Sequence, residues 1–410
     1  MPFRTRRLAL ALGGATALIA LAPAIAQRSP ESILPPGFGE PAAPPPPAAP
    51  ATPGQPAEQP PTPLIDNGAI AAPEEATADS TLDNAAAPVE VYDLPAEARR
   101  SLDRVGLLAE GAGGLGAGAF GGSDGRYLTS LMRNLNAPIA SRWASILLRR
   151  ALLSQSATPT GIGGADWVAE RTWLLVRMGE ADDARTLAQR VDSDNYTPWL
   201  YEATMQAALA SADPAALCGI ADAGAAQGGK AAWLLAQAMC AGLSGEGGTA
   251  SSLIAQARQT RGVGGIDVLL AEKVAGAGTN TRRAITIQWD GVDQLTAWRY
   301  GLATATGVAI PAELFATVGP QVQAWAARAP LFDPAMRLAE ADRAATLGVF
   351  SSAALADLYG QVYDATDPSD RGGTPADALR SAYSGASGAR LSALRGIWSG
   401  NDDNPLRGYA

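Results

Sequence analysis

The stretch LLVRMGEADDARTLAQRV, residues 174–191, places Gly179 and Glu180 between two segments whose apolar residues recur every three or four positions. Apolar residues at that spacing form one face of an α-helix. Glycine is favoured where a helix ends, because it adopts the left-handed conformation at low cost. The stretch therefore predicts two helices that are joined by a tight turn at Gly179.

The same arrangement recurs along the middle of the chain. Tryptophan recurs at Trp167, Trp199 and Trp233, at intervals of 32 and then 34 positions. Twelve residues after each tryptophan comes a small residue, and seventeen residues after each comes an alanine. These positions are Gly179, Ser211 and Gly245 at the turns, and Ala184, Ala216 and Ala250 in the second helices.

A period of about 34 positions, with a small residue at the turn and another in the second helix, resembles the tetratricopeptide-type repeat. Gly179 and Ala184 match that family's turn glycine and packing alanine. The resemblance covers residues 166–262 and implies stacked helical hairpins that offer a concave surface to a peptide or protein. The chain as a whole also resembles exported helical-repeat proteins, a resemblance that implies no activity.

The flanking regions are predicted to be helical as well. Residues 92–165 form N-terminal helices with a glycine-rich loop, residues 263–400 form a C-terminal helical region, and residues 401–410 form a tail. A helix is expected over 101–110, and the segment AITIQW, residues 284–289, is the one short candidate strand. The predicted fold class is all-α, with a helical-hairpin repeat of the α-solenoid type.

The first ninety residues do not resemble a globular domain. Residues 1–26 combine a basic start, an apolar run and an Ala-Ile-Ala exit, which is the layout of a secretory signal peptide. Residues 27–91 hold more than half of the chain's 30 prolines and predict a disordered Pro/Ala-rich tether. We therefore expect a periplasmic protein, or one anchored near the inner membrane if the leader is not cleaved.

Composition excludes several classes of chemistry. The formal net charge is −9 and becomes more negative when the basic leader is removed, which disfavours nucleic-acid binding. The chain contains no histidine, so Ser-His-Asp and Cys-His catalysis and histidine-ligated metal sites are impossible. We expect no cofactor and no metal.

A literal G-x-G-x-x-G occurs at Gly116, Gly118 and Gly121. A dinucleotide site needs a strand before this motif and an acidic residue about 20 positions after it. Residues 125–165 contain no Asp or Glu, so the nucleotide interpretation fails. A glycine-rich loop whose Phe120 packs on the domain is the better prediction.

The same acid-free window carries five arginines, at Arg126, Arg133, Arg142, Arg149 and Arg150. One interpretation is a face for anionic partners, such as lipid headgroups or an acidic protein segment. The other is that these arginines cover apolar helix faces and meet acids from elsewhere in the chain.

Cys218 and Cys240 lie at nearly equal distances on either side of the segment AQGGK. Residues equidistant from the turn of a helical hairpin lie side by side, so an oxidising compartment would favour a disulfide between them. Such a bond stabilises by about 3 kcal/mol on the loop-entropy model. Two buried thiols are the alternative.

The sequence therefore predicts a non-catalytic scaffold that binds an envelope protein or peptide. The alternative is a carboxylate-based protein that acts on cell-wall glycan, which requires an acid with a raised pKa in a helix-lined cleft. Its candidate acids are Glu170, Glu202 and Glu313, none of which lies in a motif.

Overall fold

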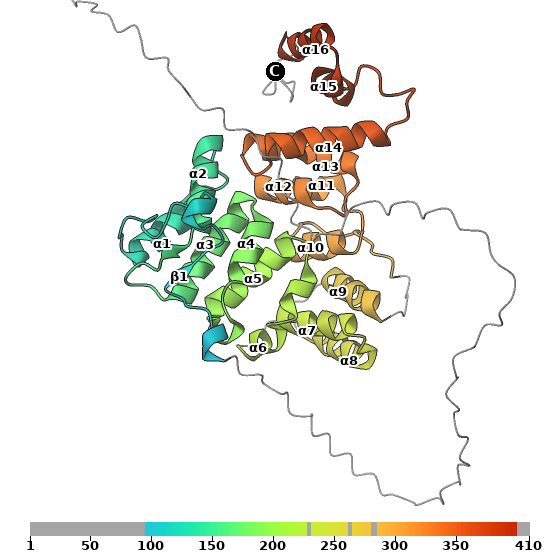
Figure 1. The fold of residues 1–410 in the computed structure, drawn as a ribbon. Coiled ribbons are helices and arrows are strands. Elements are labelled where there is room, and N and C mark those ends of the chain that lie inside the picture. The colour runs from blue at the N-terminus through green and yellow to red at the C-terminus, as the bar shows by residue number, and fades with distance from the viewer. Residues whose placement is uncertain (1–94, 228–230, 261–264, 280–284, 400–410) are drawn as a thin grey trace, which may run out of the picture. The chain divides into compact units, whose positions relative to one another are not determined.

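The computed structural model describes residues 95–227, 231–260, 265–279 and 285–399. The chain divides into two units, and all described residues belong to the second, 88–410. The predicted signal peptide 1–26, the predicted linker 27–91 and the predicted tail 401–410 lie outside the described residues. Sixteen α-helices account for most of the described residues (Figure 1), so the all-α class is confirmed.

The helices of the first half are α1 (Gly125–Asn134), α2 (Arg142–Leu153), α3 (Gly164–Met178), α4 (Ala181–Ala188), α5 (Pro198–Ala210), α6 (Ala221–Ala226), α7 (Ala231–Leu243) and α8 (Gly247–Arg258). Those that follow are α9 (Gly265–Gly278), α10 (Ala297–Ala305), α11 (Ala312–Phe315), α12 (Pro320–Arg328), α13 (Pro334–Thr346), α14 (Ser352–Ala365), α15 (Pro375–Ser384) and α16 (Ser387–Ser399). Short 3-10 helices are η1 (Ala96–Ala98), η2 (Glu110–Ala112), η3 (Ser193–Asn195) and η4 (Pro214–Leu217), and the strands are β1 (Arg104–Val105) and β2 (Ser156–Ala157).

Helices α3, α5 and α7 end in the same hydrogen-bonded turn. Each is followed by a residue with positive φ, which is 92° at Gly179, 53° at Ala212 and 86° at Gly245. The next residue is acidic in each case, and its N–H donates to the carbonyl five residues back. These bonds measure 2.9 Å from Glu180 to Leu175, 2.9 Å from Asp213 to Ala208 and 2.8 Å from Glu246 to Ala241. The pattern is that of a Schellman helix ending.

The three residues with positive φ are spaced by 33 positions. This spacing corrects the predicted alignment of the second helical hairpin, which begins with α5, by one residue. The position equivalent to Gly179 and Gly245 is Ala212, whereas the tryptophan spacing indicated Ser211. By the same count Leu200, rather than Trp199, corresponds to Trp167 and Trp233, and all three are at most 3% exposed. Trp199 is only partly buried. The three equivalent positions therefore share burial within a hairpin rather than one residue type.

The alanine position shifts in the same way. Ala184 in α4 and Ala250 in α8 are buried. The equivalent residue in the second hairpin is Leu217, which is also buried. Ala216 beside it is half-buried and lies in η4, not in an α-helix. The second member of this hairpin is thus the short η4 followed by α6, and Gly219, a poor helix former, lies between them.

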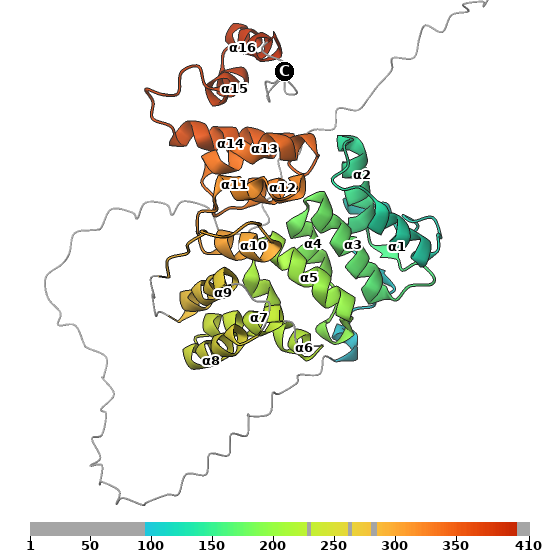
Figure 2. The same ribbon diagram turned by 180° about the vertical axis from the view of Figure 1, so that it is seen from behind.

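Two hydrophobic cores meet at α12. The first runs from Val105 to Phe332 and contains Val322 and Trp325 of this helix. The second lies over α12–α16 and contains Ala324 and Ala327 from the other face of the same helix. Helix α12 contacts both α3 and α13, an arrangement that can be followed from either side in Figures 1 and 2.

The expected helix over 101–110 is not present. Residues 104–105 instead form β1, which pairs antiparallel with β2. The N–H groups of Leu107 and Leu108 donate to the carbonyl of Leu153 at the end of α2, at 2.7 and 2.9 Å. This segment therefore satisfies its backbone by pairing with α2 and β2, and tertiary contacts override the local apolar spacing.

A fully buried arginine holds this segment in place. Arg171 of α3 donates to the carbonyl oxygens of Val105 (2.7 Å), Leu152 (3.0 Å) and Ser154 (3.2 Å). Burial lowers the pKa of Arg171 to about 9. Because three carbonyl dipoles face the guanidinium, α3 fixes both the end of α2 and the extended chain before the glycine loop.

The candidate strand over 284–289 is also not observed. Its described part, residues 285–289, has no regular secondary structure. Ile287 and Trp289 pack against the first core, and the Trp289 indole N–H donates to the carbonyl of Ala309 at 3.0 Å. The apolar alternation thus reflects packing by a loop rather than pairing in a sheet.

We predict that Gly179→Ala destabilises the protein more than Gly245→Ala. Both positions have strongly positive φ, which costs an L-residue about 1–2 kcal/mol. A Cβ at Gly179 would also meet Ala324 Cβ at 2.8 Å and Val349 at 3.2 Å, whereas nothing lies within 4 Å at Gly245. Crowding of this kind adds about 1–3 kcal/mol.

Urea unfolding of the two variants measures this difference. Ala212→Gly serves as the converse control, since it should relieve the strain of a non-glycine residue at φ 53°. Equal losses at residues 179 and 245 would show that the Gly179 turn is not packed against α12.

Candidate functional site

The turn after α3 carries a buried carboxylate that joins three parts of the fold. The Glu180 side chain is 1% exposed, and its Oε1 accepts from Arg149 Nη1 of α2 at 2.9 Å. Its Oε2 accepts from Arg328 Nη1 of α12, also at 2.9 Å. Arg328 in addition pairs with Asp182 at 3.1 Å. The carboxylate therefore bridges helices that are far apart in the sequence, since Glu180 and Arg328 are separated by 148 positions.

Burial dominates the electrostatics of this cluster. Removal from water raises the pKa of Glu180 to about 7, while Arg149 and Arg328 lower it and Asp183 raises it further. Burial likewise raises the pKa of Asp183, against the opposing pull of Arg328 and Arg149. Because a guanidinium occupies each oxygen of Glu180, this residue is placed to hold the fold together rather than to contact a substrate.

Beside the ion-pair cluster lies a cavity of about 330 Å³, which we call the arginine cavity. Three guanidinium groups line it, from Arg142, Arg149 and Arg328, together with the carboxyl of Asp183. Its apolar wall includes Ile146 and Phe350. The site is therefore rich in cationic donors but has an apolar side, a composition suited to ligand binding.

The turn at Gly348 forms part of the cavity wall. This turn has the same hydrogen bonds as the Gly179 turn, since the N–H of Val349 donates to Ala344 at 3.0 Å and φ of Gly348 is 82°. A Cβ at Gly348 would lie 3.1 Å from the carbonyl oxygen of Arg142. Glycine at this position thus allows the turn to approach α2 closely.

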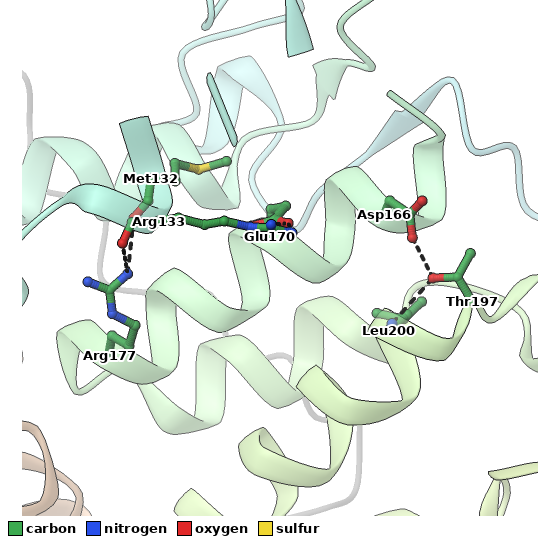
Figure 3. A network of polar contacts seen from close by, with 7 residues as sticks. All are labelled: Met132, Arg133, Asp166, Glu170, Arg177, Thr197 and Leu200. Carbon is green, nitrogen blue, oxygen red and sulfur yellow. Dashed lines mark hydrogen bonds and ion pairs between the residues drawn. The ribbon is translucent and has the colours of Figure 1, made fainter. Parts of the chain in front are cut away.

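Glu170 lies in a second buried polar network (Figure 3). Its side chain is 2% exposed and accepts from the Nε and Nη2 atoms of Arg133, with Nε at 3.0 and 3.1 Å from the two oxygens. Arg177 donates to the carbonyls of Met132 and Leu135, so α1 is tied to α3 at both places. Thr197 donates to Asp166 at 2.6 Å and caps α5 by accepting from the N–H of Leu200.

The three acids considered for glycan chemistry lie in different surroundings. Glu170 is occupied by Arg133, Glu202 is half-buried on α5, and Glu313 is exposed on the four-residue α11. Among the described residues no group of three His, Cys, Asp or Glu is arranged to hold a metal ion. No described helix is long and apolar enough to cross a membrane.

The five arginines of the acid-free window have different surroundings. Arg133 and Arg149 meet buried acids from α3 and the α3–α4 turn. Arg142 donates to the hydroxyl of Ser352 at 3.1 Å, and Arg150 donates to the carbonyl of Gly113 at 2.8 Å. Arg126 is exposed in the first turn of α1. Two of the five therefore follow the second interpretation, in which they meet acids from elsewhere in the chain.

Large apolar side chains remain exposed on α1 and α2. Tyr127 and Leu131 of α1 are 59% and 49% exposed, and Trp143 and Leu147 of α2 are 78% and 57% exposed. Within each helix the two residues are four positions apart and so share a face. We call these two pairs, one on each of two helices that pack on α3, the α1–α2 apolar face.

The glycine-rich loop has a structural role. Phe120 packs edge-on against Trp167 with ring centroids 4.9 Å apart, in agreement with the prediction that this ring docks on the domain. Gly116 and Gly121 have positive φ, at 76° and 60°. The motif is followed by a turn before α1 begins at Gly125.

Cys218 and Cys240 are joined by a disulfide with Cα atoms 5.3 Å apart. Cys240 lies in α7 as predicted, but Cys218 lies at the end of η4 rather than in the helix before AQGGK. The bond therefore ties the end of η4, which follows α5, to helix α7.

No sequence pattern indicates that Glu180, Asp183 and Arg328 belong to one site. Glu180 and Asp183 lie in the stretch 174–191. An acidic residue follows each turn residue in the sequence, and this is a local pattern that can be recognised. Arg328 carries no such signal, since only the tertiary fold brings α12 to the turn.

We predict that the Glu180→Gln variant has a flatter dependence of stability on pH than the wild type. The folded-state pKa near 7 exceeds the ordinary value of 4.5, so the folded protein retains a proton that the unfolded chain releases. The stability from this group is complete below about pH 4.5 and is lost as the pH rises through 7, at about 1.4 kcal/mol per pKa unit.

Urea unfolding between pH 5 and pH 8 measures the effect. The wild type should lose stability relative to Glu180→Gln over this range, whereas Glu313→Gln, at an exposed carboxyl, should follow the wild type. Parallel profiles for wild type and Glu180→Gln would contradict the assignment.

Comparisons with protein-family models, curated proteins and solved structures found no match for this chain.

Proposed function

We propose that this protein is a non-catalytic, periplasmic scaffold of helical repeats that binds a protein or peptide partner in the cell envelope. The observation that carries the proposal is the α1–α2 apolar face, Tyr127, Leu131, Trp143 and Leu147. Exposed apolar clusters with aromatic residues are characteristic of interaction surfaces, and tryptophan is the residue most enriched at binding hot spots.

The charge around this face favours one kind of partner. Arg126 and Arg150 are exposed on the same two helices, and residues 125–165 contain no acid. The chain as a whole has a formal net charge of −9, so this basic window stands out against it. Complementarity therefore favours a protein segment that carries both apolar and acidic side chains.

The repeated turns support the scaffold part of the proposal. The hydrogen bonds at Gly179, Ala212 and Gly245 recur every 33 positions, a period close to that of tetratricopeptide-type repeats. Stacked hairpins of this kind function by presenting surfaces rather than by supplying reactive groups. The basic leader and Ala-Ile-Ala exit support export, and a retained leader would keep the scaffold beside the inner membrane.

The glycan-acting alternative gains no support from the site. A glycosidase needs two carboxyl groups facing one cleft. Asp183 is the only described carboxyl that lines the arginine cavity, and Glu180 is held behind two guanidinium groups.

Affinity purification from an envelope fraction tests the proposal with three full-length proteins. The wild type and Leu331→Ala, which removes an equally exposed leucine elsewhere, should recover the same partner. Trp143→Ala combined with Leu147→Ala should reduce recovery at least tenfold, since hot-spot truncations cost about 2 kcal/mol or more.

The identity of the partner provides the second criterion. The bound region should be an acidic segment, and a synthetic peptide of that segment should bind the wild type more weakly as salt is added. Equal recovery by the wild type and the double variant would contradict the proposal. A partner without an acidic segment, or with salt-independent binding, would contradict the electrostatic part.

A further inference from the structure

We infer that the arginine cavity is a binding site for a small organic anion, with a carboxylate or phosphate group held by arginines and an apolar body against Phe350. This site is distinct from the α1–α2 apolar face and goes beyond the scaffold function. Its volume of about 330 Å³ lies at the lower end of the range for small-molecule sites, about 300–1,000 Å³.

The positive charge of Arg142 is not neutralised by an ion pair within the described part of the chain. Its guanidinium donates to the neutral hydroxyl of Ser352, and it forms no ion pair with any residue that the structure describes. Its Nε is buried and has no hydrogen-bond partner within the described part of the chain. A buried N–H without an acceptor is costly, so the Nε of Arg142 supplies a reason for a ligand with an acceptor group.

The second observation is that two further guanidinium groups are already fixed in place. Glu180, which is not part of the cavity wall, holds Arg149 and Arg328, each at 2.9 Å. Both arginines also line the cavity, with side chains about a quarter exposed. Because Glu180 fixes their positions before binding, little side-chain entropy is lost when an anion enters.

The third observation is the helix that begins at the cavity. Ser351 and Ala354 line it, and α14 runs for 14 residues from Ser352. The Ser351 hydroxyl accepts from the N–H of Ala354 at 3.0 Å, which places the first turn of the helix at this region. The positive end of the helix dipole adds to the attraction for an anion.

The acids around the site balance only part of this charge. Asp183 lines the cavity, Glu180 lies behind Arg149 and Arg328, and Asp182 pairs with Arg328 at the more exposed edge. Burial raises the pKa of Glu180 to about 7, which weakens the negative charge of this carboxyl near neutral pH. An anion beside the arginines would therefore meet a net attractive field.

The apolar wall specifies the rest of the ligand. Ile146, Val349 and Phe350 contribute the large apolar side chains of the lining. A fully hydrated ion would leave this surface unused, whereas an anion joined to a small apolar group would cover it. The chemical class is thus an aryl or alkyl carboxylate or phosphate ester.

Isothermal titration calorimetry on the full-length protein tests this assignment with four probes, namely phenyl phosphate, benzoate, inorganic phosphate and uncharged benzyl alcohol. Phenyl phosphate or benzoate should bind, and which of the two binds identifies the anionic group. Benzyl alcohol should not bind, and inorganic phosphate should bind at least tenfold more weakly than phenyl phosphate. If neither organic anion binds at millimolar concentration, the site assignment is overturned. Equal affinity for phenyl phosphate and inorganic phosphate would overturn the inference that the ligand has an apolar body packed against Phe350.

Two variants and a matched control localise the binding. Arg142→Gln should weaken the binding of the organic anion at least tenfold. Arg150→Gln, at an exposed arginine of the same helix, should leave the affinity unchanged. Ala354→Phe fills the cavity without removing any charge and should abolish binding, so it tests the site even if Arg142→Gln fails to fold. Wild-type affinity in a folded Arg142→Gln or Ala354→Phe protein would overturn the proposal.

Discussion

The structure is organised around Glu180 and the two guanidinium groups that bind its carboxyl. Two oxygens accept one hydrogen bond each from Arg149 and Arg328, so a single buried residue at a helical turn connects α2 with α12. Beside it, Gly179 lets Ala324 and Val349 approach the backbone of the turn. Removing one member of such a cluster is costly, because it leaves an uncompensated charge in a region sheltered from water.

The same turn serves different purposes along the chain. Each of the three equivalent turns places an acid after the residue of positive φ, but the environments differ. Glu180 is buried between two arginines, Asp213 forms a half-exposed pair with Arg185 at 3.1 Å, and Glu246 is exposed. A local motif that recurs for backbone reasons thus becomes a tertiary junction only where α12 packs on it, and the arginine cavity is formed at that junction.

Much of this architecture could be predicted from the sequence, and the failures have physical causes. Apolar spacing correctly indicated an all-α fold, and Gly179 and Gly245 were identified as turns because positive φ favours glycine. Ala212 was missed because an alanine in that conformation carries no sequence signal. The helix expected over 101–110 was wrong because β2, the end of α2 and Arg171 offer its backbone better partners. The candidate site needed Arg328, which no local pattern connects to Glu180.

A double-mutant cycle between Glu180 and Arg328 tests most directly whether this junction holds the fold together. The free energies of unfolding of the wild type, Glu180→Gln, Arg328→Met and the double variant would be measured at pH 8, where the carboxyl is mostly ionised. We expect a coupling energy of about 1–3 kcal/mol, the range found for residues in one buried network. Additive losses, with a coupling energy near zero, would show that the pair contributes little and that α12 is held to the turn by apolar packing alone.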